Sequence, residues 1–221
     1  MKIEIYIPNS LDEITLGQYQ KFLAIAQDKE QDLFIQQKMV EIFCRLNLKD
    51  IANIKYTSLV EIIEHFNNIF SKEQELIQSF KMDGLEFGFV PKLDDITFGE
   101  YVTLDTYIGD WKNMDKVMEV LYRPITNKHK SSYNIENYQN GKYDMTKMPL
   151  SAALSSIIFF YNLGNELLKT TLSYLVKQAS RTIAEQQVLG ENGDGINQST
   201  QLLKETLKTL NSLKQQMFIN V

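Results

Sequence analysis

Most of the chain carries the hydrophobic pattern of helices, and a smaller part alternates as strands do. Apolar and polar residues alternate over Ile3–Ile7 and Leu85–Val90, and each stretch ends at a proline, which predicts two short strands. An Asp83-Gly84 turn predicts that the second strand forms a hairpin with Phe80–Met82. The predicted fold class is therefore mainly α with short β elements. We expect helices at about residues 15–27, 31–47, 58–70, 97–107, 111–122 and 150–189.

Nearly the same nine residues occur twice, as LDEITLGQY at Leu11–Tyr19 and as LDDITFGEY at Leu93–Tyr101. Both copies contain the spacing of a capping box. In this motif a threonine side chain accepts a hydrogen bond from the amide three residues later, and a Gln or Glu side chain accepts one from the threonine amide. The same spacing predicts three helix starts, at Thr15 with Gln18, at Thr97 with Glu100 and at Ser58 with Glu61.

The repeat divides the chain into predicted segments. A strand, a proline and a capped helix with further helices occur in residues 1–80 and again in 81–171. These are predicted to be related units, and a true duplication and a reused local structure both explain the likeness. Residues 172–221 are predicted to form a helical hairpin, whose second helix has apolar residues seven apart that suit packing on its own domain or on a neighbouring subunit. Those residues include Leu203, Leu210 and Met217.

The segment 124–148 is the least regular internal part of the chain, and it is basic and rich in tyrosine. Three interpretations stay open. Its tyrosines hold a solvated loop to the chain's own core, they contact a partner protein, or they stack on the bases of a single strand. Arg123 precedes the proline where the predicted helix must end, so we expect it to cap that helix or to pair with Asp110 or Glu119. The candidate partner interface comprises Trp111, Arg123, Lys128, Lys130, Tyr133, Tyr138, Tyr143, Leu203, Leu210 and Met217.

Composition narrows the function classes. Apolar residues make up 43% and charged residues 23%, as in ordinary globular proteins. The net charge of −5 argues weakly against nucleic acid as the main partner. The single cysteine, Cys44, excludes an internal disulfide framework and is predicted to be a buried apolar residue. The longest apolar run, Leu150–Tyr161, is too short to cross a bilayer, so no membrane partner is expected.

No constellation of residues indicates catalysis, a metal or a cofactor. The two histidines, His65 and His129, lack a second ligand at helical spacing. The loop GENGDG resembles a calcium loop only in part, because Gly190 and Gln201 stand where carboxylates are essential. The acids Asp94 and Asp95 belong to the repeated capping sequence, which favours a structural role over acid–base chemistry. An enzyme is therefore not expected.

Three stretches of the second half carry a resemblance to a known group of proteins. They are LDDITFGEYVTLDTYIGDW (Leu93–Trp111), MDKVMEVLYRPI (Met114–Ile125) and MPLSAALSSIIFFYNLGNELL (Met148–Leu168). They resemble small proteins that tailed bacteriophages, crAss-like phages in particular, encode in or near their virion-structure genes. The resemblance covers roughly residues 85–170, and its most specific parts are TFGEY, YRP and FFYNLGNELL.

The resemblance implies a non-enzymatic virion component, made in the host cytoplasm, without cofactor or catalytic residues. Its partners would be other phage structural proteins of the tail, a ring or the portal region, with self-association in a ring as a further possibility. A packaged cargo protein and a tail-assembly chaperone are alternatives within this group. An accessory protein that binds nucleic acid is the alternative from another class.

Overall fold

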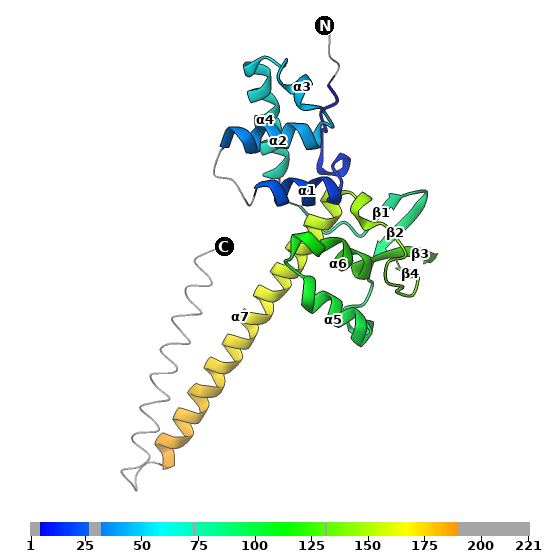
Figure 1. The fold of residues 1–221 in the computed structure, drawn as a ribbon. Helices are drawn as coiled ribbons and strands as arrows, with labels where there is room; N and C mark the ends of the chain where they lie inside the picture. The colour runs from blue at the N-terminus through cyan, green and yellow to red at the C-terminus, as the bar shows by residue number, and fades with distance from the viewer. Residues whose placement is uncertain (1–4, 27–31, 73, 131, 190–221) are drawn as a thin grey trace. The chain divides into compact units, whose positions relative to one another are not determined.

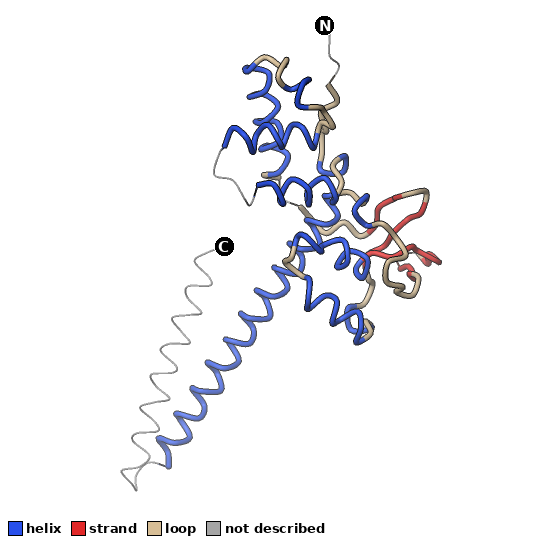
Figure 2. The backbone as a smooth tube through the Cα atoms, in the orientation of Figure 1, coloured by secondary structure: helices blue, strands red, loops and turns tan. Residues whose placement is uncertain are grey.

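The computed structural model describes residues 5–26, 32–72, 74–130 and 132–189. The chain divides into two compact units, residues 1–159 and 160–221. Helices dominate, and four short strands form a small antiparallel sheet in the first unit, so the predicted fold class is confirmed (Figures 1 and 2).

The helices are close to their predicted positions. The predicted helix 31–47 ends early, as α2 at Phe43, because Arg45 has a φ of 55°, which a helix cannot accommodate; the short helix α3 follows beyond the predicted range. The predicted helix 111–122 begins as the 3-10 turn η3 and ends one residue early. The α-helices are α1 (Leu16–Ala26), α2 (Asp32–Phe43), α3 (Leu48–Ile51), α4 (Tyr56–Phe70), α5 (Phe98–Tyr107), α6 (Met114–Leu121) and α7 (Leu150–Leu189). The 3-10 turns are η1 (Leu11–Glu13), η2 (Leu93–Asp95), η3 (Trp111–Asn113) and η4 (Met145–Lys147).

The sheet has the strand order β1-β2-β3-β4, and each neighbouring pair is antiparallel. Asp83 (φ 49°) and Gly84 (φ 79°) make the tight turn between β1 and β2, which confirms the predicted hairpin. The prediction of an irregular segment at 124–148 is wrong for its first half, where β3 and β4 form a second hairpin. The cause is tertiary, because β3 also pairs with β2 on its other side. The strands are β1 (Ser79–Met82), β2 (Leu85–Phe89), β3 (Tyr122–His129) and β4 (Ser132–Ile135).

The first predicted strand is wrong over its described part. Residues 5–8 have no regular secondary structure, and residues 1–4 lie outside the described part of the chain. A strand needs a partner edge, and the sheet is built from later strands. The link to the second half is instead an isolated bridge between Thr15 and Pro149. In this bridge the Leu16 amide donates to the Met148 carbonyl at 3.0 Å, and the Leu150 amide donates to the Ile14 carbonyl at 2.8 Å.

The two predicted halves pack together within the first unit. Helix α1 contacts η3 and η4, which come from the second half of the sequence. Leu16 at the start of α1 and Leu150 at the start of α7 are both fully buried. The division of the chain therefore falls at residue 159, within the continuous helix α7, whereas the predicted segments were 1–80, 81–171 and 172–221. Other fully buried core side chains are Ile14, Met114, Met118, Leu121, Tyr122 and Met148.

Candidate binding site around Arg123

Both predicted capping boxes of the repeat are present. The Thr15 amide donates to Gln18 Oε1 at 3.0 Å, and the Gln18 amide donates to Thr15 Oγ1 at 3.2 Å. The Thr97 amide donates to Glu100 Oε2 at 2.6 Å, and the Glu100 amide donates to Thr97 Oγ1 at 3.3 Å. The third predicted box is wrong: α4 begins two residues before Ser58, and Lys55 precedes it without a side-chain cap. Helix α4 thus begins without the capping box that its sequence predicts.

The second polar atom of each capping side chain makes a long-range contact. Gln18 Nε2 donates to the Ile42 carbonyl at 2.6 Å, which ties α1 to α2. Glu100 Oε1 lies 2.9 Å from Arg123 Nη1, which ties α5 to β3. The Glu100 side chain is 3% exposed and the Arg123 side chain is 12% exposed, so this ion pair is buried. The two copies of the repeat therefore make different tertiary contacts, although their capping boxes are the same.

The prediction for the partner of Arg123 is wrong. Arg123 lies in β3, because α6 ends at Leu121, and it pairs with neither of the expected acids. Asp110 caps η3 by accepting from the Lys112 amide at 3.1 Å. Glu119, itself buried, accepts hydrogen bonds from the backbone amides of residues 141 and 142 at 2.9 and 2.7 Å. Both carboxylates therefore accept hydrogen bonds from backbone amides, and neither pairs with Arg123.

Glu100 leaves hydrogen-bond donors of Arg123 without an acceptor. The Nε–H of Arg123 is buried without a hydrogen-bond partner among the described residues. Glu100 Oε1 is close enough to Nη1 for charge attraction but lacks the geometry of a hydrogen bond. A buried guanidinium with unused donors is costly unless an acceptor reaches it.

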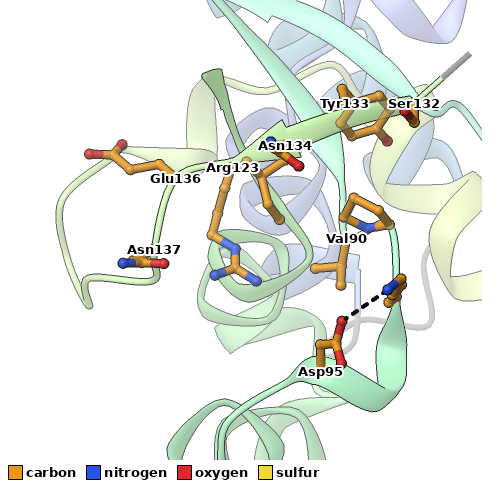
Figure 3. A pocket seen from close by; sticks show the side chains of 11 residues that line it. Val90, Asp95, Arg123, Ser132, Tyr133, Asn134, Glu136 and Asn137 are labelled. Carbon is orange, nitrogen blue, oxygen red and sulfur yellow. Dashed lines mark ion pairs between the residues drawn. The ribbon is translucent and has the colours of Figure 1, made fainter. Parts of the chain in front are cut away.

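Arg123 lines a pocket of about 450 Å³ between β4 and the segment that follows β2. One wall comes from the segment that follows β2, including Val90, Lys92 and Asp95, and the other comes from residues 132–137 of β4 and its extension. Figure 3 shows the guanidinium of Arg123 between Asn137 on one side and Val90 and Asp95 on the other.

The charges around this pocket nearly balance. Lys92 and Asp95 form an exposed pair with a separation of 3.7 Å on one rim. On the other rim Glu136 accepts hydrogen bonds from the Lys142 ammonium and, at 2.7 Å, from the Tyr143 hydroxyl. These two donors, Lys142 first, lower the pKa of Glu136. The pocket thus carries a buried positive group at its wall and one acid on each rim.

The tyrosines of the segment 124–148 make contacts within the chain. The Tyr133 hydroxyl donates to the Phe89 carbonyl at 2.7 Å, and burial raises the Tyr133 pKa. Its ring crosses directly over Gly88, where an added Cβ would lie 2.5 Å from a ring carbon. The Tyr143 ring packs edge-on against Phe87 with a centroid distance of 5.2 Å. These contacts favour the first of the three interpretations of this segment, in which the tyrosines hold it to the core.

The remaining predicted interface residues do not converge on the pocket. The Trp111 ring packs edge-on against Tyr19 at 5.0 Å, within the first unit. Lys128 pairs with Glu86 at 2.7 Å, and Lys130 lies in the β3–β4 turn. The Tyr138 hydroxyl donates to the Asn140 side chain at 3.3 Å. Leu203, Leu210 and Met217 lie outside the described residues.

The structure brings two of the predicted residues, Arg123 and Tyr133, into the same pocket. Sequence reasoning missed the rim residues Lys92 and Asp95 and the amides of Asn134 and Asn137. A signal for the first rim was present, because Asp95 belongs to the repeated capping sequence. Nothing local indicated that β4 would lie opposite it, since that depends on the pairing of β3.

A second exposed feature lies on the part of α7 that belongs to the second unit. Tyr161, Leu168 and Leu175 follow one another at seven-residue spacing and are 70%, 53% and 41% exposed. Leu167 and Tyr174 have the same spacing and are also exposed. Seven-residue spacing places each set along one side of the helix, so α7 carries an exposed apolar band. We call these five residues the α7 band.

The described residues contain no group of three or more His, Cys, Asp or Glu side chains that could hold a metal ion. Within the same part of the chain, every helix is too short or too polar to cross a membrane. Comparison with protein-family models, with curated proteins and with solved structures finds no match to this chain.

Proposed function

We propose that this chain is a non-enzymatic structural component of a tailed-phage virion that binds another phage structural protein through the α7 band. The band is the observation that carries the proposal. Soluble proteins rarely expose a contiguous set of large apolar side chains unless a partner covers them. The resemblance of residues 85–170 to phage virion-region proteins indicates the kind of partner.

The composition of the α7 band suits a helical partner. It contains three leucines and two tyrosines, and tyrosine supplies a large contact area while its hydroxyl stays in contact with water at the rim. The seven-residue spacing matches that of a helix that packs alongside at a small crossing angle. A partner helix of a tail or connector protein that presents its own apolar seam would bury the band, and its polar residues would remain exposed.

The segment 124–148 contributes less to this proposal than the sequence suggests. Tyr133 and Tyr143 are engaged with the sheet, and Lys128 is paired with Glu86. Binding through helix faces is therefore favoured over binding through this segment. The same contacts weigh against the nucleic-acid alternative, which needs free tyrosine rings and free lysines.

The test compares two variants in particles assembled during infection. Leu168→Glu places a charge in the α7 band, whereas Thr170→Glu places the same charge at an exposed position outside it. Purified virions are then analysed by quantitative mass spectrometry for this chain. We expect the wild type and Thr170→Glu in the particles and Leu168→Glu largely absent from them.

Three other outcomes would contradict or replace the proposal. Retention of Leu168→Glu at the wild-type level would contradict the role of the band. Absence of the wild-type chain from virions, together with its recovery on one unassembled tail protein, would replace the proposal with a tail-assembly chaperone. Retention of the chain inside DNA-filled heads after the tails have been removed would indicate a packaged cargo protein.

A further inference from the structure

We propose that the pocket at Arg123 binds a single carboxylate that a partner protein presents on an extended segment lying along β4. This site is separate from the α7 band, and nothing in the proposal depends on the band. Three features of the site indicate this ligand: the unused donors of Arg123, the charges on the two rims and the position of β4 at the edge of the sheet.

The guanidinium has more donors than its internal partner can use. An arginine side chain carries five N–H donors in a planar fork. Glu100 approaches Nη1 through Oε1 alone, because Oε2 already accepts the hydrogen bond of the Thr97 amide. The Nε–H has no partner among the described residues. Because Nε is closed off from solvent, an acceptor that enters the pocket meets the N–H groups of Nη1 and Nη2, and it can form charge-assisted hydrogen bonds with them without displacing Glu100.

The rim charges select a monoanion. Asp95 and Glu136 lie on opposite rims of the pocket, and Glu100 lies behind Arg123. Lys92 is paired with Asp95 and Lys142 with Glu136, so a phosphate dianion would bring two negative charges to one guanidinium that Glu100 already partly neutralises, which disfavours it. One carboxylate can reach Arg123 between the rims. The residues that flank it on the partner are then expected to be polar or basic, because they face Asp95 and Glu136.

The edge of the sheet explains why the ligand is expected to be extended. β4 is the last strand in the order β1-β2-β3-β4, so within the described residues its outer side has no strand partner. The pocket takes in residues 132–137, Arg123 of β3 and the segment that follows β2, so it lies on the face of the sheet beside this edge. An extended segment can add its backbone hydrogen bonds to such an edge while one side chain enters the adjacent pocket. The exposed amides of Asn134 and Asn137 offer further partners for its backbone.

The experiment begins with a selection of random seven-residue peptides on the immobilised full-length chain. The most enriched peptide is synthesised with a fluorescent label, and its affinity is measured by anisotropy. We expect it to contain one Asp or Glu flanked by polar or basic residues. Conversion of that acid to its amide should weaken binding about tenfold, as the loss of a charge-assisted hydrogen bond does. Acetate should compete with the peptide weakly, and inorganic phosphate should compete no better than acetate.

Three variants of the chain, each checked for folding by circular dichroism, make the result specific. Arg123→Lys should weaken the peptide about tenfold, because a point charge cannot form the planar fork. Glu100→Gln should strengthen it, because the guanidinium is no longer shared, while the cap survives as it does with Gln18. Lys81→Ala removes a positive charge from β1 at the opposite edge and should leave the affinity unchanged.

The proposal is overturned if no peptide is enriched or if the enriched peptides lack an acidic residue. It is also overturned if neither Arg123→Lys nor Glu100→Gln changes the affinity for the peptide. This result would count against the Arg123 site alone, whether or not Leu168→Glu abolishes incorporation into virions. Stronger competition by phosphate than by acetate would replace the peptide carboxylate with a free or bound phosphate as the ligand.

Discussion

Glu100 and Arg123 join a helix start to a strand through one carboxylate. Oε2 of Glu100 completes the capping box with Thr97, and Oε1 lies 2.9 Å from Arg123 Nη1. The same side chain therefore sets where α5 begins and holds the arginine that lines the pocket. Any change in this pair acts on both the local stability of α5 and the shape of the candidate site.

Removal of Arg123 should destabilise the fold strongly. Arg123→Ala leaves the 3%-exposed Glu100 carboxylate without its counter-ion, and such losses typically cost about 3–5 kcal/mol. The double variant Glu100→Gln with Arg123→Ala should recover much of this loss, because the remaining amide is neutral. Chemical denaturation of the two single variants and the double variant measures the coupling. Strictly additive losses would contradict a direct interaction between these side chains.

The two capping threonines should each contribute to stability. Thr15→Ala and Thr97→Ala remove the side-chain acceptor of a confirmed capping box, and each should lower the free energy of unfolding by about 1 kcal/mol. Ser58→Ala is the matched control, because Ser58 has the spacing of a cap but lies within α4. It should change stability little. Urea denaturation of the three variants checks this, and equal losses at all three positions would argue against a specific capping effect.

Gly88 should tolerate no side chain. An added Cβ would lie 2.5 Å from a Tyr133 ring carbon and 2.9 Å from Ile125 Cγ1, so Gly88→Ala forces the β3–β4 hairpin away from β2. We expect a loss of about 1–3 kcal/mol, as for other overpacked sites. Gly99→Ala is the control, because a Cβ there meets nothing within 4 Å and alanine favours the helix. The difference in thermal midpoint between these variants tests the close approach of Tyr133.

Cys44 should be unreactive in the native chain. It is 3% exposed, and burial raises its pKa to about 11. Because the thiolate is the nucleophile, labelling with Ellman's reagent at pH 8 should be on the order of 100-fold slower than in denaturant. Rapid labelling of the native chain at its unfolded rate would contradict this burial.

The raised pKa of Cys44 also predicts a loss of stability in alkali. The unfolded thiol releases its proton near its ordinary pKa, whereas the native thiol keeps it until about pH 11. Stability should therefore be complete below about pH 8.5 and fall between there and pH 11, by at most about 1.4 kcal/mol per pH unit from this group. Burial also raises the pKa of Tyr19 and Tyr133, so these tyrosines contribute to the loss of stability in alkali as well. The difference between the pH dependence of the free energy of unfolding of the wild type and that of Cys44→Ala gives the contribution of the cysteine alone.

Features that depend on neighbouring residues were predictable from the sequence. The capping boxes at Thr15 and Thr97 involve residues three apart, and the Asp83-Gly84 turn closes a hairpin of adjacent strands. The bounds of α7 at Leu150 and Leu189 were predicted as the structure has them. In each case the interactions that determine the structure lie within a few residues, so their pattern is visible in the chain itself.

Tertiary pairing decided the rest. Residues 5–8 have the alternation of a strand but no partner edge, and Ser58 has the spacing of a cap but lies inside α4. The segment after Arg123 looked irregular, yet it became a hairpin because β2 offers β3 an edge. The partner of Arg123 was likewise undetermined, since the sequence suggested Asp110 or Glu119 and gave no sign of Glu100. The repeated helix start supplied Glu100, and only the packing of α5 against α6 and β3 placed its free oxygen beside the guanidinium, where burial makes a charged partner necessary.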